Sequence, residues 1–545
     1  MKKGQTYEGV VKSISFPNKG LVETKVFRLK KNEQEITPEM LEGGWPEKNG
    51  INMSQDVEET TERAIVKGSF PGQKIKYYVN KKKGGKCEGR IEEILEKSPL
   101  EDAEPACPHF GACGGCSYQS LSYENQLKLK YEMVLDLIKP VLKTDATVFE
   151  GIVPSPSKWE YRNKMEFTFG DAYKGGPLEL GLHKKGSNYD VVPLKACKIV
   201  DDDYNKILNT VVGHFRDLNV PYYHTMSHEG VLRHLLVRRS KTTGEISVNL
   251  VTTSQYRGYM SEFNAEEGGK IEESELALAE LKEKLLTLDK GLNGNIVGIT
   301  HIINDALGDV VKCDEMRIIH GRDYIMEEIL GLKFKVSTFS FFQTNSLGAE
   351  RLYEKARDFV RESVGGDLEA LKGKTMFDLY SGTGTIAQMM SPVVGKVVGV
   401  EIVEDAVEAA KENAALNGLK NCEFIAGDVL KVIDEIKEKP DYIILDPPRD
   451  GINPKALEKI IDFGVEKMVY ISCKPTSLAR DLVLLQERGY KLEKLACVDM
   501  FPQTVHVETV CLLSNRKPNT KVRIDVDLED YYRIKDEQKK NKASE

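Results

Sequence analysis

The sequence predicts a multidomain α/β protein whose C-terminal part is a doubly wound parallel sheet. From about residue 336 to 515, apolar runs that end in a glycine or an acidic residue alternate with helical patterns. Short β-rich runs separated by turn residues fill the first 98 residues. The chain of 545 residues and 61.2 kDa is also too long for a single hydrophobic core.

Four segments follow from these patterns. Residues 1–98 are expected to form a small OB-like barrel, and residues 99–335 a central mixed α+β domain that includes a charged helix over 273–286. Residues 336–515 form the predicted doubly wound domain, and residues 516–545 a charged tail.

Composition excludes several classes of protein. Hydrophobic residues make up 40% of the chain and charged residues 30%, as in soluble globular proteins. No stretch approaches the ~20 apolar residues that cross a bilayer, and the N-terminal residues lack the apolar core of a secretory signal. We therefore expect a cytoplasmic protein that does not associate with membranes. The net charge of −8 argues against a uniformly basic surface, but not against a local basic face.

The predicted barrel carries a lysine-rich hairpin in which Tyr77 and Tyr78 are interleaved. Cations and aromatic faces together suit single-stranded nucleic acid, although a solvated lysine-rich hairpin explains the pattern equally well. Residues 31–62 are acidic and predict an irregular insertion or long loop. The lysines are Lys74, Lys76, Lys81, Lys82, Lys83 and Lys86.

Glycines and acidic residues follow successive predicted strands of the C-terminal domain. The run that ends at Asp378 leads into Gly382-Thr383-Gly384, where missing Cβ atoms let a ligand approach the backbone. Later strands end at Glu401, Asp428 and Asp446, and no phosphate-binding loop is present. This pattern favours S-adenosylmethionine over NAD or ATP. The alternative is that Glu401 and Asp428 cap the following helices.

A thiol and a carboxyl are the candidate reactive groups. Cys473 follows a strand directly and precedes Pro475, which can open a helix whose dipole, together with Lys474, would favour the thiolate. Taken alone, such a cysteine is more often a small core residue. Glu508 stands in an apolar run, where a carboxylate must be either paired or functional.

A further cluster of cysteines predicts a metal site. Because we expect no disulfide framework in a cytoplasmic chain, clustered cysteines indicate metal binding or thiol chemistry. From spacing alone, zinc and an iron–sulfur cluster carry equal weight, since both accept four thiolates. The predicted ligands are Cys107, Cys113, Cys116 and Cys197.

Seven motifs together resemble one family, the RNA uracil-5-methyltransferases, which include bacterial 23S rRNA enzymes and a tRNA enzyme. The resemblance runs from about residue 65 to 515. The motifs are FFQTN (341–345), DLYSGTGT (378–385), LDPPR (445–449), SCKPTSLARD (472–481) and HVET (506–509), with CPHFGACGGC and YRNKMEF upstream. Ser381 stands where many relatives have cysteine.

The resemblance implies a fold and a set of roles. The C-terminal domain is expected to be a class I (Rossmann-like) methyltransferase, the N-terminal barrel a TRAM domain, and the central domain an iron–sulfur domain. Cys473 is implied as the nucleophile that adds to uracil carbon 6, and Glu508 as the base that removes the carbon-5 proton. The implied S-adenosylmethionine contacts are Gln343, Tyr380, Glu401 and Asp446, and the implied ligands of a [4Fe-4S] cluster are Cys107, Cys113, Cys116 and Cys197.

The expected partner is RNA, and the expected assembly is a monomer. By resemblance 23S rRNA is favoured over tRNA, because the shorter tRNA enzymes commonly lack both the cluster and the TRAM module. Two other functions compete with this one. An amino-group methyltransferase would leave Cys473 and Glu508 without a role, and it usually has an aromatic residue where Arg449 stands. A non-catalytic, metal-stabilised RNA-binding protein would show no turnover.

Overall fold

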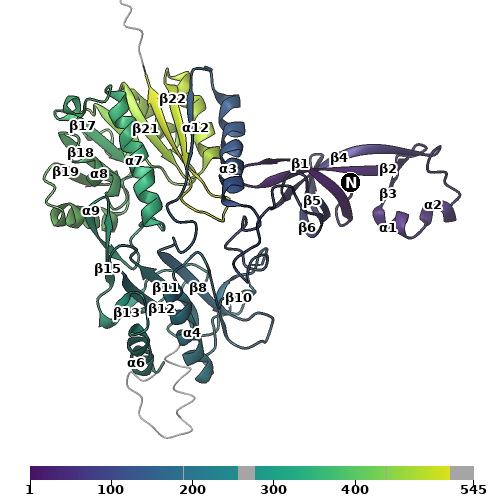
Figure 1. Cartoon of the computed structure of the whole chain (residues 1–545), viewed down its shortest axis with the longest axis horizontal. Coiled ribbons are helices and arrows are strands. Elements are labelled where there is room, and N and C mark those ends of the chain that lie inside the picture. Colours follow the sequence, from purple (N-terminus) through teal and green to yellow (C-terminus); the bar gives the residue numbers. More distant parts are fainter. Residues whose placement is uncertain (188, 256–275, 437, 516–545) are drawn as a thin grey trace, which may run out of the picture.

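The computed structural model describes residues 1–187, 189–255, 276–436 and 438–515. A two-part body holds the C-terminal sheet above the central sheet, and the N-terminal barrel projects away from it to one side (Figure 1). The predicted tail, residues 516–545, lies outside the described residues. Within the described chain, no helix is both long and apolar enough to span a membrane.

The N-terminal residues form a closed five-stranded barrel in the strand order β1-β2-β4-β6-β5-β1. β4 and β6 pair in parallel and the other neighbours are antiparallel, so the prediction of a small OB-like barrel is confirmed. The strands are β1 (Thr6–Ser15), β2 (Lys19–Leu29), β4 (Val57–Lys67), β5 (Lys74–Lys83) and β6 (Lys86–Glu96).

The acidic segment 31–62 is more regular than predicted. β2 and β4 remain paired in an antiparallel hairpin as far as Leu29 and Val57, and the chain between them folds into short elements. Glu35 from this tip is buried and accepts a hydrogen bond from the hydroxyl of Tyr7 in the barrel, which ties the tip to the barrel wall. The short elements are β3 (Glu35–Ile36), α1 (Pro38–Glu42) and α2 (Trp45–Lys48).

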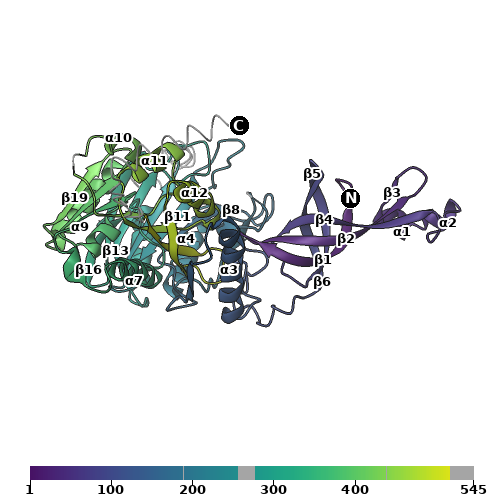
Figure 2. The same ribbon diagram turned by 90° about the horizontal axis from the view of Figure 1, so that it is seen from above.

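The barrel contacts the body beside helix α3 (Tyr123–Ile138), as seen from above in Figure 2. Phe16 and Phe70 of the barrel are buried in the same apolar cluster as Tyr118, and the rings of Phe70 and Tyr118 lie 5.5 Å apart. Burial of these aromatic rings stabilises the junction.

The central domain is a seven-stranded sheet in the order β10-β9-β8-β11-β12-β13-β14, in which only β12 and β13 pair in parallel. Helices α4 (Asp202–Asp217) and α6 (Leu278–Asp289) contact each other and the sheet; α6 overlaps the predicted charged helix, whose first residues lie outside the described chain. The strands are β8 (Lys164–Gly170), β9 (Glu179–His183), β10 (Val191–Pro193), β11 (Leu232–Arg239), β12 (Glu245–Thr252), β13 (Asn295–Ile303) and β14 (Glu315–Gly321), and the hairpin β15 (Tyr324–Ile329) and β16 (Leu332–Ser337) leads onward.

The C-terminal sheet has eight strands in the order β19-β18-β17-β20-β21-β23-β22-β7. The run from β19 to β21 is parallel, β23 is antiparallel to both neighbours, and strand order reverses between β17 and β20. Such a reversal opens a ligand crevice at the carboxyl ends of the strands. The strands are β7 (Val148–Val153), β17 (Thr375–Leu379), β18 (Lys396–Glu401), β19 (Cys422–Ala426), β20 (Tyr442–Leu445), β21 (Lys467–Ser472), β22 (Lys491–Val498) and β23 (Glu508–Ser514).

Helices cover both faces of this sheet, and each face has its own apolar core. One core includes residues of α7, α8 and α9, and the other residues of α3, α10, α11 and α12. The helices are α7 (Ser346–Ser363), α8 (Thr385–Met390), α9 (Glu404–Leu416), α10 (Val429–Val432), α11 (Pro454–Asp462) and α12 (Pro475–Glu487), and short 3₁₀ turns lie at Lys139–Val141 and Leu368–Leu371.

Two elements from the segment predicted as the central domain belong to the C-terminal sheet. β7 pairs in parallel with β22, and α3 packs against α12 and β7. Without β7, the strand β22 would be an unprotected edge, which proteins avoid exposing. The structural boundary therefore does not fall at a single point near residue 336.

Candidate active site

The predicted reactive residues converge because the parallel strands of the C-terminal sheet end at the same edge. Cys473 directly follows β21, and Asp446 directly follows β20. Glu401 is the last residue of β18, and the turn Gly382–Gly384 follows β17. β17 pairs with both β18 and β20, and β20 with β21, so all four positions lie along one continuous edge.

Cys473 and Glu508 lie at the adjoining ends of two antiparallel strands, and the charge of Glu508 acts on the Cys473 thiol. Ser472 of β21 pairs with Thr509 of β23, and the Thr509 hydroxyl donates a hydrogen bond of 3.1 Å to the carbonyl oxygen of Ser472. One residue beyond this pair lie Cys473, which directly follows β21, and Glu508, the first residue of β23. The charges of Glu508 and Asp446 both act on the thiol, so the thiol and the two carboxyls are close together.

Burial sets the protonation of the two carboxyls. Glu508 is only 4% exposed, and burial, helped by the charge of Asp446, raises its pKa to about 8. Burial also raises the pKa of Asp446 to about 7. Arg449 opposes the shift at Glu508. At neutral pH these carboxyls therefore exchange protons easily, which suits general acid–base chemistry.

The electrostatic environment of Cys473 differs from the prediction. Burial, together with the charges of Glu508 and Asp446, raises the pKa of this thiol to about 11, although Arg449 acts to lower it. The ammonium group of Lys474 lies 3.7 Å from Asp450 rather than contributing at the sulfur. The thiol is therefore protonated before substrate binds, since burial and the two carboxyl neighbours outweigh the opposing effect of Arg449 on its pKa.

The glycine turn of residues 382–384, called the glycine cradle below, lies at the same strand ends as these groups. Gly384 has φ +71°, and a Cβ there would lie 2.5 Å from Cε1 of Phe424, so only glycine fits. Tyr380 also has a positive φ of 70°, a strained conformation for a tyrosine that is typical of ligand sites. The backbone N–H of Gly382 donates to Oε2 of Glu401 at 2.9 Å, which joins the turn to the acidic end of β18.

Unpartnered polar atoms line this cradle and fit a nucleoside cofactor. Asp378 is fully buried and accepts a hydrogen bond from the Ala387 N–H at 2.9 Å through one carboxylate oxygen. Its other oxygen and the hydroxyl of Ser381 are buried without a hydrogen-bonding partner in the described chain. Buried polar atoms without partners are costly, so they mark a place where a polar ligand belongs. The charges of Asp446 and Glu401 add to burial in raising the pKa of Asp378 to about 8.

Gln343 reaches the same site from the loop before α7. Its side chain is hydrogen-bonded to the hydroxyl of Tyr353, a buried residue of α7. Burial raises the pKa of Tyr353 well above its ordinary value, and the charges of Asp446, Asp378 and Glu508 raise it further. Gln343, Tyr353 and the carboxyls therefore form one polar cluster.

Three residues of this cluster were not among the predicted site residues. Asp378 and Arg449 lie within the motifs DLYSGTGT and LDPPR. The sequence could therefore have indicated both as site residues, Asp378 from its place before the glycine turn and Arg449 from its place after the two prolines. Tyr353 had no such signal, because it occupies a buried position of an amphipathic helix. Asp428 is a helix cap, the alternative to a cofactor contact, since its side chain caps α10 by accepting a hydrogen bond from the Leu430 N–H at 2.9 Å.

The cysteine cluster is only partly as predicted. The four thiols lie close enough to act on one another's charge. Burial, with the charges of Cys107 and Cys113, raises the pKa of Cys197 to about 11, and burial, with the charges of the other three thiols, raises the pKa of Cys116 to about 12. Among the described residues, however, no group of three or more His, Cys, Asp or Glu side chains is arranged so that it could hold a metal ion. The expected metal site is thus not shown.

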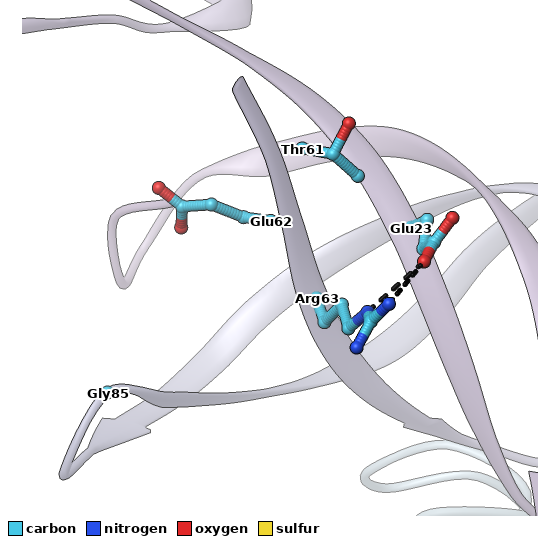
Figure 3. Close-up of a pocket in the computed structure, with 5 residues that line it drawn as sticks. All are labelled: Glu23, Thr61, Glu62, Arg63 and Gly85. Atoms are coloured by element: carbon cyan, nitrogen blue, oxygen red, sulfur yellow. Dashed lines mark hydrogen bonds and ion pairs between the residues drawn. The ribbon is translucent and has the colours of Figure 1, made fainter.

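The N-terminal barrel contains a separate polar hollow, drawn in Figure 3. Arg63 and Glu23 form an ion pair of 3.0 Å across it, and Glu62 points to the other side of its strand (Figure 3). The residues that line this hollow all belong to the barrel and not to the strand ends of the C-terminal sheet. On the lysine-rich hairpin, Tyr77 is fully buried in the barrel, so only Tyr78, under the guanidinium of Arg90, remains near the surface.

The doubly wound sheet with its antiparallel β23, the glycine cradle and the acidic strand ends together define a class I, S-adenosylmethionine-dependent methyltransferase. Residues 306–516 match the tRNA (Uracil-5-)-methyltransferase family. An uncharacterized RNA methyltransferase of Clostridium tetani is 50% identical over 448 residues, which cover 82% of this chain and 92% of that protein. The chain therefore belongs to the RNA (uracil-5-)-methyltransferase family.

Two further comparisons agree with this assignment. An uncharacterized RNA methyltransferase of Caldanaerobacter subterraneus subsp. tengcongensis is 48% identical over 82% of this chain and 93% of that protein. The crystal structure of Pyrococcus abyssi tRNA (uracil-54, C5)-methyltransferase with S-adenosyl-L-homocysteine superposes with a TM-score of 0.61. It covers 83% of this chain and 94% of its own, at 23% identity, and so shows a shared fold.

Proposed function

We propose that this protein methylates carbon 5 of a uridine in RNA through a covalent adduct between Cys473 and carbon 6 of the uracil. The observation that carries the proposal is the closeness of Cys473 to Glu508 and Asp446, at the edge that also carries the glycine cradle. A thiol close to a buried carboxyl has no use in amino-group methylation or in passive RNA binding, whereas uracil methylation needs both groups.

The chemistry follows from the weak nucleophilicity of uracil carbon 5. The Cys473 thiolate adds to carbon 6, and the electron pair of the carbon 5–carbon 6 double bond moves toward carbon 5 and the carbon-4 oxygen. Carbon 5 can then accept a methyl group. The Glu508 carboxylate removes the remaining carbon-5 proton, the double bond re-forms, and the carbon–sulfur bond breaks. Two easier steps thus replace one difficult step.

Proton balance in this scheme depends on the neighbours of the sulfur. The Cys473 thiol must lose its proton when the substrate binds, and Arg449 lowers its pKa whereas Glu508 and Asp446 raise it. Glu508, with a pKa raised to about 8, is close to the range that a general base needs at neutral pH.

S-adenosylmethionine is the proposed cofactor, and when bound it supplies an electrophilic methyl group. The glycine cradle and the unpartnered oxygens of Asp378 and Ser381 support this assignment. We assign Glu401 to the ribose hydroxyls, as acidic residues at this strand end do in nucleotide-binding folds. Gln343, Tyr380 and Asp446 complete the proposed contacts.

The proposed substrate is 23S rRNA, with tRNA as the second candidate. The OB-like barrel favours an RNA that extends beyond the catalytic edge, because such barrels bind nucleic acid on their surfaces. The structural neighbour from Pyrococcus abyssi acts on uracil 54 of tRNA, which keeps tRNA in consideration. The target uridine must also be flipped out of its stack to reach Cys473.

We also propose that Cys107, Cys113, Cys116 and Cys197 bind a [4Fe-4S] cluster, supported by the mutual proximity of their thiols. Anaerobically purified protein should contain iron and sulfide and absorb visible light, and replacing Cys116 with serine should remove the absorption. Zinc without iron in the purified protein would instead favour a four-cysteine zinc site.

Methylation of defined transcripts tests the proposed activity. Purified protein with S-adenosylmethionine should produce 5-methyluridine at one or a few positions of a 23S rRNA transcript and leave a tRNA transcript unmodified. The reverse preference would replace the proposed substrate. Cys473→Ala should abolish methylation, whereas Cys87→Ala, a buried cysteine of the barrel, should leave it unchanged. Undiminished methylation by Cys473→Ala would contradict the mechanism.

A further inference from the structure

The loop between β22 and β23 places the proposed base. Val498, the last residue of β22, pairs with Glu508, the first residue of β23, so residues 499–507 close this hairpin directly at the catalytic carboxyl. Any shift of the loop therefore moves Glu508 relative to Cys473.

Four successive carbonyl groups of this loop accept hydrogen bonds from residues outside the hairpin. Asn345 donates to Met500 at 2.9 Å, and the Lys130 ammonium donates to Phe501 at 3.0 Å. Tyr161 donates through its hydroxyl to Pro502 at 3.0 Å. The N–H groups of Ser117 and Tyr118 donate to Gln503 at 2.8 and 3.0 Å. The loop is therefore held by α3, by the central domain, by the start of α7 and by the segment from Cys107 to Gln119, called the cysteine-rich segment below.

Gln503 is the centre of this arrangement. It is 2% exposed and has a positive φ of 67°, a costly conformation for a residue other than glycine. The side chain of Gln126 on α3 accepts from the Gln503 N–H and donates to its side-chain oxygen, both at 2.9 Å. This reciprocal pair satisfies groups that would otherwise be buried without partners, so it stabilises the strained backbone.

The same contacts join the loop to the cysteine-rich segment. Ser117 and Tyr118 directly follow Cys116, and the side chain of Gln119 accepts from the Cys107 N–H at 3.0 Å. The cysteine-rich segment is thus attached, through the carbonyl of Gln503, to the loop 499–507 that leads to Glu508.

We infer that Gln126 and Gln503 are positioning residues for the proton-abstraction step, and that the cysteine-rich segment acts on catalysis through them. The inference rests on the proposed function, because it requires Glu508 to remove the carbon-5 proton. Losing the glutamine pair should let Glu508 drift while Cys473, on the separate strand end after β21, keeps its position. The second half of the reaction then slows more than the first.

The test compares Gln126→Leu, Gln503→Leu and the double variant, in the full chain, on unmodified RNA. Gln126→Leu leaves the Gln503 N–H without an acceptor, so we expect methylated, covalently linked RNA–protein complex to accumulate because its resolution slows roughly 10- to 100-fold, while adduct formation changes little. Gln503→Leu removes only one of the two bonds and should have a smaller effect. The double variant should resemble Gln126→Leu, since the partners are lost together.

Gln486→Leu is the matched control. Gln486 is also a buried glutamine that joins two elements, since it accepts from the Lys143 N–H at 2.8 Å and donates to the Val141 carbonyl at 3.0 Å. Within the described part of the chain, it has no hydrogen bond to the loop 499–507. It should lower the unfolding midpoint about as much as Gln126→Leu, but without accumulation of the complex.

Two results would overturn the inference. One is equal slowing of adduct formation and resolution in Gln126→Leu, and the other is an unslowed resolution step in both single variants. If Gln126→Leu does not fold, Gln503→Leu alone decides between these results. Trapping of the wild-type protein by 5-fluorouridine RNA distinguishes failure of this inference from failure of the proposed function. If the wild-type protein is not trapped, the proposed function is wrong. If it is trapped but the methylated complex does not accumulate in the variants, only this inference is wrong.

Discussion

At the scale of single residues, the reactive thiol and the carboxyls are all held in their protonated forms more strongly than usual. The pKa of Cys473 is raised to about 11, that of Glu508 to about 8 and that of Asp446 to about 7. The sequence predicted Cys473 and Glu508 as candidate reactive residues, and their roles as nucleophile and base came from the family resemblance and stay predictions. The thiol's raised pKa was not predictable, because it arises from burial in the folded chain and from two carboxyls that are 27 and 35 positions away in the sequence.

The first prediction concerns pH. The ionised fraction of Glu508 rises as pH approaches 8, so in single-turnover experiments the rate of adduct resolution should increase about tenfold per pH unit between pH 6 and 8 and level off above it. Adduct formation should continue to rise up to pH 9, because the pKa of Cys473 is about 11. A resolution rate that does not change between pH 6 and 9 would be inconsistent with Glu508 as the base.

The second prediction concerns stability. Because folding raises the pKa of Glu508, the folded state keeps a proton that the unfolded state releases between the ordinary carboxyl pKa and about 8, and stability falls as pH rises through this window. Glu508→Gln cannot ionise, so it should stabilise the protein by on the order of 4 kcal/mol at pH 8 and by much less at pH 5. Thermal unfolding midpoints at both pH values, with the exposed Glu487→Gln as control, measure this difference.

At the scale of secondary-structure elements, the strand–turn–helix pattern was predictable wherever glycines and acidic residues punctuate apolar runs. The OB-like strand pattern was predictable for the same reason. The hairpin tip over 31–62 was not, because its short helices α1 and α2 bury few apolar residues and its charges resemble those of a loop. Likewise, Tyr77 looked available for base stacking, and only the barrel register shows that it faces the core.

The third prediction tests the glycine cradle. In Gly384→Ala the new Cβ would lie 2.5 Å from Phe424, so the turn must move and S-adenosylmethionine binding should weaken at least tenfold. Gly418→Ala is the matched control, because Gly418 has a similar φ of 67° but no atom within 4 Å of the new Cβ. Titration calorimetry compares the two. Equal affinities for both variants would show that the cofactor does not depend on this turn.

At the scale of the whole molecule, sequence patterns placed the three bodies but not their boundaries. β7 and α3 come from a stretch that reads as central domain, yet they complete the C-terminal sheet and the core beneath α12. A pairing between β7 and β22 spans over 340 positions, and no local pattern reveals such a partner. The cysteine cluster shows the same limit, since spacing indicates which thiols are candidates but not whether they surround a metal.

The fourth prediction follows from that pairing. A fragment of residues 321–515 lacks β7 and α3, so it exposes the β22 edge and the apolar surface of α12, and we expect it to aggregate or remain unfolded. A fragment of residues 99–515 keeps both elements and should fold. Circular dichroism and gel filtration distinguish these outcomes. A monomeric, cooperatively unfolding shorter fragment would show that β7 is dispensable for the sheet.

The most direct test of the whole account is covalent trapping with RNA that carries 5-fluorouridine at the target position. Fluorine at carbon 5 cannot be removed as a proton, so the complex should survive denaturation, and mass spectrometry of its peptides should place the RNA on Cys473 with the methyl group already transferred. Glu508→Gln should trap to the same extent. A complex attached at another residue, or an equally stable complex formed by Cys473→Ala, would contradict the account.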